Sequence, residues 1–467
     1  MAQQYDLIVV GSGPGGYPAA IRASQLGMKV AIVEKESLGG ICLNWGCIPT
    51  KALLKSAQVF EYIKHAKDYG ITIQDGAYAA DFNAVIKRSR GVADGMNKGV
   101  TFLMKKNKID VIMGYGKVKG NKTVEVTAAD GTKTDYTATK GVVIATGGRA
   151  RELPNIKIDG TKVIEYRKAM SLEKQPKSLL VIGSGAIGVE FAYVYASMGT
   201  KVTIVEFMPR VVPVEDEDIS KELAKQYKKL GIDIYTDSAV ESVDTSGEGC
   251  KVKVKTPDGE KTFEVDVVLS AAGVVANIEN IGLEDVGIAT DKGKIVVNQW
   301  YETNIPGFYA IGDCTPGQAL AHVATAEAII CVEKIAGHHT EPLDYGNIPG
   351  CTYCTPEIAS VGLTEKKARE LGYDVKVGKF PFVASGKAKA AGAPDGFVKV
   401  IFDAKYGEWL GAHMIGYNVT EMIAEVVVAR KLETTAQEIL RAVHPHPTMS
   451  ESVKGATEAA YGEAIDI

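Results

Sequence analysis

Two cysteines five positions apart are the residues best suited to redox chemistry. Cys42 and Cys47 lie in the run GGICLNWGCIPTK, residues 39–51. Three glycines crowd the pair, which implies backbone packed closely against something flat. The run starts shortly after a dinucleotide-binding fingerprint. The pair is therefore a candidate redox disulfide beside a bound nucleotide cofactor, with two unrelated core cysteines as the alternative.

The residues after the second cysteine predict a helix that activates its thiol. Pro49 suits the first position of a helix, which would place Ile48 at the cap and Cys47 just before it. A thiolate at a helix N-terminus is stabilised, so its pKa falls. Lys51 would then lie in the first turn, against the helix dipole, and we expect it to have another partner.

A dinucleotide-binding fingerprint occurs twice, with an offset of 172 residues. Each copy reads as a buried strand, a G-x-G-x-x-G turn, a helix and a second strand that ends in an acid. The glycines and the acid of each copy are Gly11, Gly13, Gly16 and Glu34, then Gly183, Gly185, Gly188 and Glu206. The first glycine permits a tight turn, the second lets the backbone approach a pyrophosphate, and the third allows close helix–strand packing. The acid can accept hydrogen bonds from a ribose.

The acid of the second copy bears on the choice of coenzyme. A carboxylate at Glu206 would repel the 2′-phosphate of NADP, so NAD is favoured. Arg210 is close in sequence and leaves NADP open.

A histidine motif near the C-terminus could supply an acid–base group. The run HPHPTMSE places Glu451 five residues after His446, with prolines fixing the backbone around the imidazoles. A rigid histidine oriented by a carboxylate is the arrangement used to activate nucleophiles. The alternative is an ordinary surface or core histidine.

Composition excludes several classes of function. The 467 residues suggest about three domains. A net charge of −4 without a basic block gives nucleic-acid binding no support. No apolar run reaches the roughly 18 residues that span a bilayer. Seven cysteines, an odd and sparse set, indicate a reducing compartment. The start at Met1 without a presequence favours the cytoplasm.

The pattern along the chain predicts an α/β fold with two Rossmann-like dinucleotide-binding domains and a C-terminal α+β domain. The expected boundaries are 1–149, 150–274, 275–346 and 347–467. Further expected elements are strands at 5–10, 29–34, 123–127, 140–145, 178–182, 201–206, 375–381 and 397–402, and helices at 189–198, 419–430 and 435–441.

Three other features read as structural. The acidic run 215–218 is expected to be a solvated helix start. Cys351 and Cys354 have the spacing of a zinc knuckle but no second pair, so no metal is expected. Cys314 and Cys331 are expected to be buried small residues.

The cysteine run resembles the redox signature of the flavin-dependent pyridine nucleotide–disulfide oxidoreductases. Its form, LNWGCIPTK, resembles the branch of that family that acts on dihydrolipoyl groups. The resemblance extends over essentially the whole chain and includes Ala145-Thr146-Gly147 and the run 309–313, YAIGD. It implies that the four predicted domains are, in order, an FAD domain, an NAD domain, a central domain and a dimer-interface domain.

The resemblance also assigns roles to residues. Cys42 would meet the substrate and Cys47 would stack on the flavin, while Lys51 would lie near the flavin, paired with Glu190. Asp313 would bond the ribityl chain. The residues implied for FAD are Gly11, Gly13, Gly16, Glu34, Lys51, Thr146, Gly147, Gly312, Asp313 and Ala321. Those implied for NAD are Gly183, Gly185, Gly188, Glu206 and Gly273.

The implied enzyme is a homodimer that oxidises protein-bound dihydrolipoamide and reduces NAD. His446, oriented by Glu451, would act as acid–base across the dimer interface, and His444 would support it. The partners would be lipoyl domains of 2-oxoacid dehydrogenase acyltransferases or the glycine cleavage H protein.

Two kinds of alternative stay open. A glutathione or trypanothione reductase would favour NADP, against which Glu206 argues, and a mercuric reductase would add a C-terminal cysteine pair, which is absent after Cys354. A scaffold role in a multienzyme complex is the alternative from a different class, and the intact cysteine–histidine set argues for activity.

Overall fold

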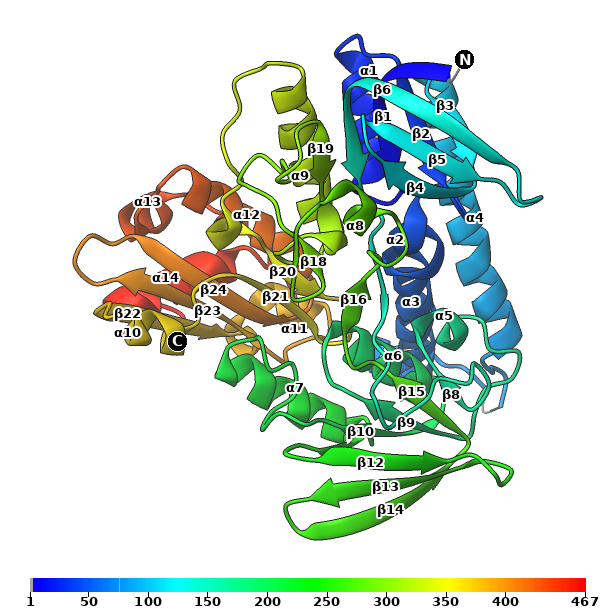
Figure 1. Cartoon of the computed structure of the whole chain (residues 1–467). Helices are drawn as coiled ribbons and strands as arrows, with labels where there is room; N and C mark the ends of the chain where they lie inside the picture. The colour runs from blue at the N-terminus through cyan, green and yellow to red at the C-terminus, as the bar shows by residue number, and fades with distance from the viewer. Residues whose placement is uncertain (1–2, 75) are drawn as a thin grey trace. The chain divides into compact units, whose positions relative to one another are not determined.

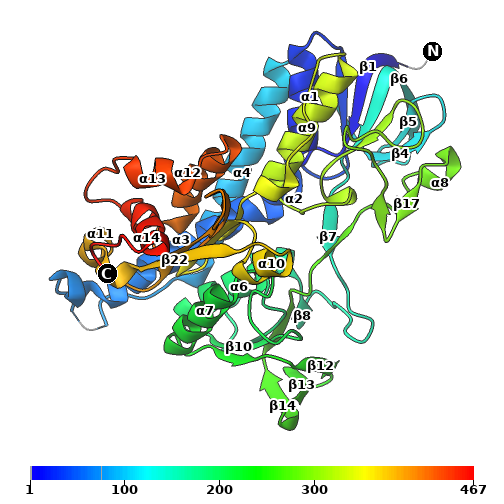
Figure 2. The same ribbon diagram turned by 90° about the vertical axis from the view of Figure 1, so that its left-hand side faces the viewer.

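The computed structural model, drawn in Figures 1 and 2, describes residues 3–74 and 76–467. It divides into two compact units. Each unit is assembled from three stretches of the chain. The first unit contains the chain up to residue 52 together with 86–151 and 273–343. The second contains 53–85, 152–272 and 344–467.

The first unit is built on a sheet with strand order β3-β2-β1-β6-β5-β4, with β19 paired to β6. β5 pairs antiparallel with both β4 and β6, and the other pairings are parallel. The strands are β1 (Gln3–Val10), β2 (Val30–Glu34), β3 (Asp110–Met113), β4 (Tyr115–Lys119), β5 (Thr123–Thr127), β6 (Lys133–Ile144) and β19 (Phe308–Ala310). The end of β1 and all of β2 are buried, as expected for parallel strands covered on both faces.

Helices and two small ribbons complete the first unit. They are α1 (Gly16–Gln25), α2 (Gly40–Trp45), the start of α3 (Cys47–Lys64), most of α4 (Phe82–Lys106), α8 (Leu283–Val286), α9 (Ala321–Ile335), β7 (Gly148–Ala150) with β16 (Val274–Ala276), and β17 (Thr290–Asp291) with β18 (Lys294–Ile295). α1 lies beside α9 (Figure 2), where the Arg22 guanidinium donates to Glu333 and the Thr325 hydroxyl donates to the Pro14 carbonyl. These bonds fix the first glycine-rich turn against α9.

The second unit begins with a parallel sheet of order β11-β10-β9-β15-β8 and an antiparallel ribbon β12-β13-β14. Its elements are α5 (Tyr166–Ala169), α6 (Ala186–Ser197), α7 (Glu217–Lys229), β8 (Val163–Ile164), β9 (Ser178–Ile182), β10 (Lys201–Val205), β11 (Asp233–Tyr235), β12 (Ala239–Asp244), β13 (Cys250–Thr256), β14 (Gly259–Val265) and β15 (Val267–Ser270).

The C-terminal part of the second unit is an antiparallel sheet of order β20-β21-β24-β23-β22, packed against α12 and α14. Its elements are β20 (Gly350–Thr352), β21 (Glu357–Gly362), α10 (Glu365–Glu370), β22 (Val375–Pro381), α11 (Gly386–Ala390), β23 (Phe397–Asp403), β24 (Trp409–Gly416), α12 (Val419–Lys431), α13 (Ala436–Arg441) and α14 (Glu451–Tyr461). The predicted fold class is confirmed.

The helix predicted to follow the cysteines starts earlier than expected, as does α6, which begins at Ala186 rather than at 189. α3 begins at Cys47 rather than at Pro49, so the cysteine is the first helical residue. Pro49 is still tolerated because the first turn of a helix leaves its N–H groups without intrahelical partners. The first bond of this turn runs from the Thr50 N–H to the Gly46 carbonyl (3.1 Å).

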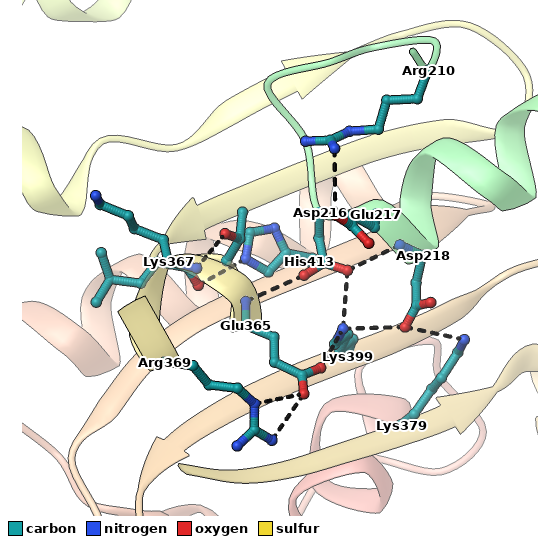
Figure 3. Close-up of polar contacts among 12 residues, drawn as sticks. Arg210, Asp216, Glu217, Asp218, Glu365, Lys367, Arg369, Lys379, Lys399 and His413 are labelled. Carbon is teal, nitrogen blue, oxygen red and sulfur yellow. Dashed lines mark hydrogen bonds and ion pairs between the residues drawn. The ribbon is translucent and has the colours of Figure 1, made fainter. Parts of the chain in front are cut away.

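The acidic run 215–218 starts α7, but it is only partly solvated, because Glu215 and Asp216 are buried. Asp216 caps α7 and is only 3% exposed. Its carboxylate meets the buried Lys399 ammonium of β23 at 3.0 Å, and that ammonium also meets Asp218 and Glu365 (Figure 3). A charge pair of this kind cannot be foreseen locally, because Lys399 is remote in sequence. It ties α7 to the C-terminal sheet.

Candidate active site

The two cysteines of the redox run form a disulfide. Cys42 is in α2 and Cys47 begins α3, with Cα atoms 4.7 Å apart. Gly46 separates the helices, and a Cβ there would lie 3.2 Å from the Cys42 Cα. Glycine therefore lets the chain fold back tightly enough to close the bond, and the predicted disulfide is confirmed.

The surface against which the glycines pack is the first fingerprint turn. The Gly39 N–H donates to the Ser12 carbonyl (3.1 Å), and a Cβ on Gly40 would lie 2.6 Å from the Gly13 Cα. The redox segment is therefore fastened directly to the turn that is expected to hold a pyrophosphate.

The two fingerprint turns have matching geometry. A Cβ on Gly11 or Gly183 would lie 2.2 or 2.7 Å from a backbone carbonyl oxygen. The third glycines are as crowded, since Gly16 and Gly188 would place a Cβ 1.9 and 2.1 Å from the carbonyl oxygen of the first glycine. A Cβ on either middle glycine, Gly13 or Gly185, would meet no atom closer than 4.0 Å. Two glycines of each turn thus serve the fold, and the middle one leaves room for a phosphate to approach.

The acids that follow the turns are held in the same way. Glu34 accepts from the Ser12 N–H (3.0 Å) and hydroxyl (2.5 Å), while Glu206 accepts from those groups of Ser184 (2.7 and 2.6 Å). Both carboxylates are buried, with exposed fractions of 7% and 6%. Burial and these bonds hold each acid beside its glycine-rich turn, where a ribose follows the pyrophosphate.

A cavity of about 410 Å³ lies beside the first turn. Its lining includes Gly11 and Thr146, both predicted for FAD, and Lys35, Arg149 and Asn277, which sequence reasoning missed. The Asn277 side chain donates to the Thr146 carbonyl (3.1 Å). An open space next to the phosphate-binding turn fits the adenosine end of a dinucleotide, so the residues present fit FAD.

The other residues predicted for FAD are spread over the first unit. Burial raises the pKa of Asp313, and the Lys294 ammonium partly offsets this effect. A carboxyl group can bond hydroxyl groups such as those of the ribityl chain of FAD, as predicted for Asp313. The neighbouring Gly312 N–H donates to Glu327 (2.6 Å). The remaining predicted residues are Gly147, whose carbonyl accepts from the Asn277 N–H, and Ala321, which begins α9.

The residues expected around the flavin's reactive edge fall in different units. Lys51, half-buried in the first turn of α3, belongs to the first unit. Glu190, 4% exposed on α6, belongs to the second and accepts from the Tyr353 N–H (2.9 Å). Their pairing stays a prediction. Gly273, predicted for NAD, falls in the first unit with a φ of +99°, while the other NAD residues lie in the second.

The histidine motif has the predicted base–orienter geometry. The His446 Nδ1 lies 2.9 Å from the Glu451 carboxylate at the start of α14, and its side chain is 79% exposed. Partial burial of Glu451 raises its pKa, but the Thr448 N–H and His446 outweigh this and hold it below its usual range. His444 instead bonds Glu425 (2.7 Å), which raises the pKa of His444.

Among the described residues, no group of three or more His, Cys, Asp or Glu side chains could hold a metal ion. None of the described helices is long and apolar enough to cross a membrane. Cys314, Cys331 and Cys354 are buried, as predicted for the first two.

Comparison with known proteins assigns the family. The pyridine nucleotide-disulphide oxidoreductase family matches residues 5–328, and the dimerisation domain of the same family matches residues 348–457. The chain belongs to the pyridine nucleotide-disulphide oxidoreductase family. The resemblance seen in the cysteine run is confirmed.

Three relatives that are similar over their whole length are dihydrolipoyl dehydrogenases. Dihydrolipoyl dehydrogenases of Rhizobium etli and Zymomonas mobilis are each 50% identical, with 100% of both chains covered. That of Bacillus subtilis is 43% identical over the same share.

Solved structures share the fold closely. LpdA from Mycobacterium tuberculosis is 26% identical with a TM-score of 0.90, covering 98% of this chain and 99% of that one. The flavoprotein disulfide reductase RclA of Escherichia coli, as its Cu(II) complex, is 28% identical with a TM-score of 0.88 and covers the same shares.

Proposed function

We propose that this protein is a homodimeric dihydrolipoyl dehydrogenase that moves two electrons from a dihydrolipoyl dithiol to NAD through FAD. The observation that carries the proposal is the Cys42–Cys47 disulfide fastened to a dinucleotide-binding turn. Relatives of that name that match over full length support it.

The chemistry begins at the disulfide. One substrate thiol gives its proton to His446 of the partner subunit while its sulfur attacks the Cys42 Sγ. The Cys42–Cys47 bond breaks, and Cys47 leaves as a thiolate at the N-terminus of α3, which stabilises negative charge. The second substrate sulfur then displaces Cys42 from the mixed disulfide. The substrate leaves oxidised, and the cysteine pair holds both electrons.

The cofactor would lie along the first unit, with its pyrophosphate at Gly11–Gly16 and its adenosine end in the cavity beside Thr146. When bound, FAD supplies the two-electron relay between a dithiol and a nicotinamide. Lys51 would supply a cation near the reactive edge, and Glu451 keeps the His446 imidazole in one orientation.

Coenzyme choice follows from Glu206. Its carboxylate is buried and fixed by Ser184, so it stays ready for the two ribose hydroxyls of NAD and would repel a 2′-phosphate. The partners would be lipoyl domains of 2-oxoacid dehydrogenase acyltransferases or the glycine cleavage H protein. A cytoplasmic location, favoured by the sparse cysteines, also belongs to this proposal.

The test is a cysteine replacement with two assays. We expect Cys47→Ser to lower NAD reduction by dihydrolipoamide at least about 1,000-fold, because no disulfide can accept the electrons. NADH oxidation by ferricyanide needs cofactor but no disulfide and should stay within a few-fold, whereas Cys351→Ser, the matched control, should change neither. A Cys47→Ser enzyme with normal dihydrolipoamide turnover would sink the proposal.

A further inference from the structure

Side chains of α4 bond the backbone on both sides of the cysteine pair in the redox segment, residues 39–51. This helix runs alongside α2 and the start of α3 (Figures 1 and 2). Asn97 donates to the Leu38 carbonyl before α2 (2.8 Å), and Ser89 donates to the Pro49 carbonyl in α3 (2.8 Å). These bonds hold the flanks of the cysteine pair.

A third side chain of α4 reaches the link between the cysteines. The Arg90 guanidinium carbon lies 4.3 Å from the centre of the Trp45 ring, within the range of a cation–π contact. Its Nη2 donates to the Asn44 carbonyl. Asn44 and Trp45 are the last two residues of α2, where carbonyls have no intrahelical partner. Arg90 therefore caps α2 and stacks on its last residue.

This grip matters most when the disulfide is open. While the bond is closed, the two sulfurs themselves tie α2 to α3. Reduction removes that tie and leaves Gly46 as the joint between the two helices. The reduced sulfurs then stay close enough to re-form the bond only if something else fixes the joint, because closure of a dithiol depends on the effective concentration of one thiol at the other.

We propose that Arg90 is a positioning residue of the redox centre, which by capping α2 and stacking on Trp45 keeps the Cys42 and Cys47 thiols apposed after reduction. The inference rests on the proposed role of the pair. Nothing in the mechanism above uses Arg90, and its planar, permanently charged group suits both contacts at once.

The experiment compares Arg90→Met with Lys87→Met in the FAD-loaded enzyme. Lys87 is an exposed cation on the same helix, three residues away, so its loss is a matched control for charge. We expect Arg90→Met to lower kcat for NADH-dependent lipoamide reduction about 10-fold with KM unchanged, as looser apposition slows disulfide closure. Ferricyanide reduction should stay within two-fold. Trapping by alkylation in dithiothreitol buffers should show the pair about 10-fold easier to reduce.

A double-mutant cycle decides whether Arg90 acts through Trp45. Trp45→Leu should give a loss similar to that of Arg90→Met, and the double variant should be no worse than the poorer single one. Additive losses overturn the proposal. So does an Arg90→Met enzyme that matches Lys87→Met throughout, or one that loses lipoamide reduction and ferricyanide reduction equally.

If Arg90→Met does not fold, Arg90→Lys replaces it. This variant should lose less lipoamide reduction and keep its ferricyanide reduction, and an equal loss of both reactions again overturns the proposal. Failure of the proposed function is separate, since it would appear as a normally active Cys47→Ser enzyme.

Discussion

The disulfide between Cys42 and Cys47 and the pair formed by His446 and Glu451 differ in how many contacts with the rest of the chain hold them in place. Cys42 and Cys47 sit in half-buried helices fastened to the fingerprint turn and gripped by α4. His446 carries one carboxylate partner and presents a side chain that is 79% exposed.

This difference suggests that the two halves of the proposed active site are built differently. The redox half is held by bonds within the first unit. In the acid–base half, Glu451 orients the His446 ring through Nδ1. The other ring nitrogen, Nε2, is the one that would exchange a proton with the substrate. A dimerisation domain covers this part of the chain. An exposed histidine in such a domain is suited to act as acid–base on the cysteine pair of a second subunit.

The largest expected effect tests that division directly. His446→Ala should lower dihydrolipoamide turnover about 100- to 10,000-fold, the usual range for a lost acid–base group. Ferricyanide reduction by NADH should stay unchanged, because the redox half is intact. Steady-state rates of both reactions check this, and a near-normal dihydrolipoamide rate would remove His446 from the mechanism.

Mixing subunits sharpens the same prediction. Inactive Cys47→Ser and His446→Ala dimers, dissociated and reassociated together, should recover about a quarter of wild-type turnover, since half of the dimers then hold one complete site of two. A histidine acting within its own subunit would give no recovery.

Sequence reasoning succeeded where a signal is local. Buried parallel strands are continuous apolar runs, so β9 was predicted with its observed bounds, and alternation in β5 was as clear. The paired cysteines, the six fingerprint glycines and the link from His446 to Glu451 likewise depend on short spacings.

It failed where the partner is remote in sequence. The 25-residue helix α4 contains Gly91, Gly95 and Gly99, which lower helix propensity, so its contacts with the redox segment could not be foreseen. The same holds for Lys399, whose ion pairs with three carboxylates include the buried Asp216 of the acidic run (Figure 3).

A smaller effect is expected from the residue that orients the histidine. Glu451→Gln keeps an acceptor for the Thr448 N–H but removes the charge that steadies an imidazolium. Dihydrolipoamide turnover should fall about 10- to 100-fold, less than on loss of the base itself. Paired kcat and KM measurements check this, with Glu458→Gln on the same helix as the control. A loss as large as that of His446→Ala would mean that Glu451 does more than orient.

The smallest expected effect is on the free energy of unfolding, and it tests whether Glu451 orients His446 or holds the fold together. The pKa of Glu451 is lowered in the folded protein, so the stabilisation it contributes is present above its unfolded value near 4.5 and is lost as pH falls through the folded value. The His446 side chain is 79% exposed and that of Glu451 is 36% exposed, so solvent screening should limit this contribution to about 0.5 kcal/mol. Denaturant unfolding of wild type and Glu451→Gln should therefore differ slightly at pH 7 and converge near pH 3. A difference of several kcal/mol at pH 7 would show that the carboxylate holds the fold, and the turnover loss could then no longer be assigned to the orientation of His446.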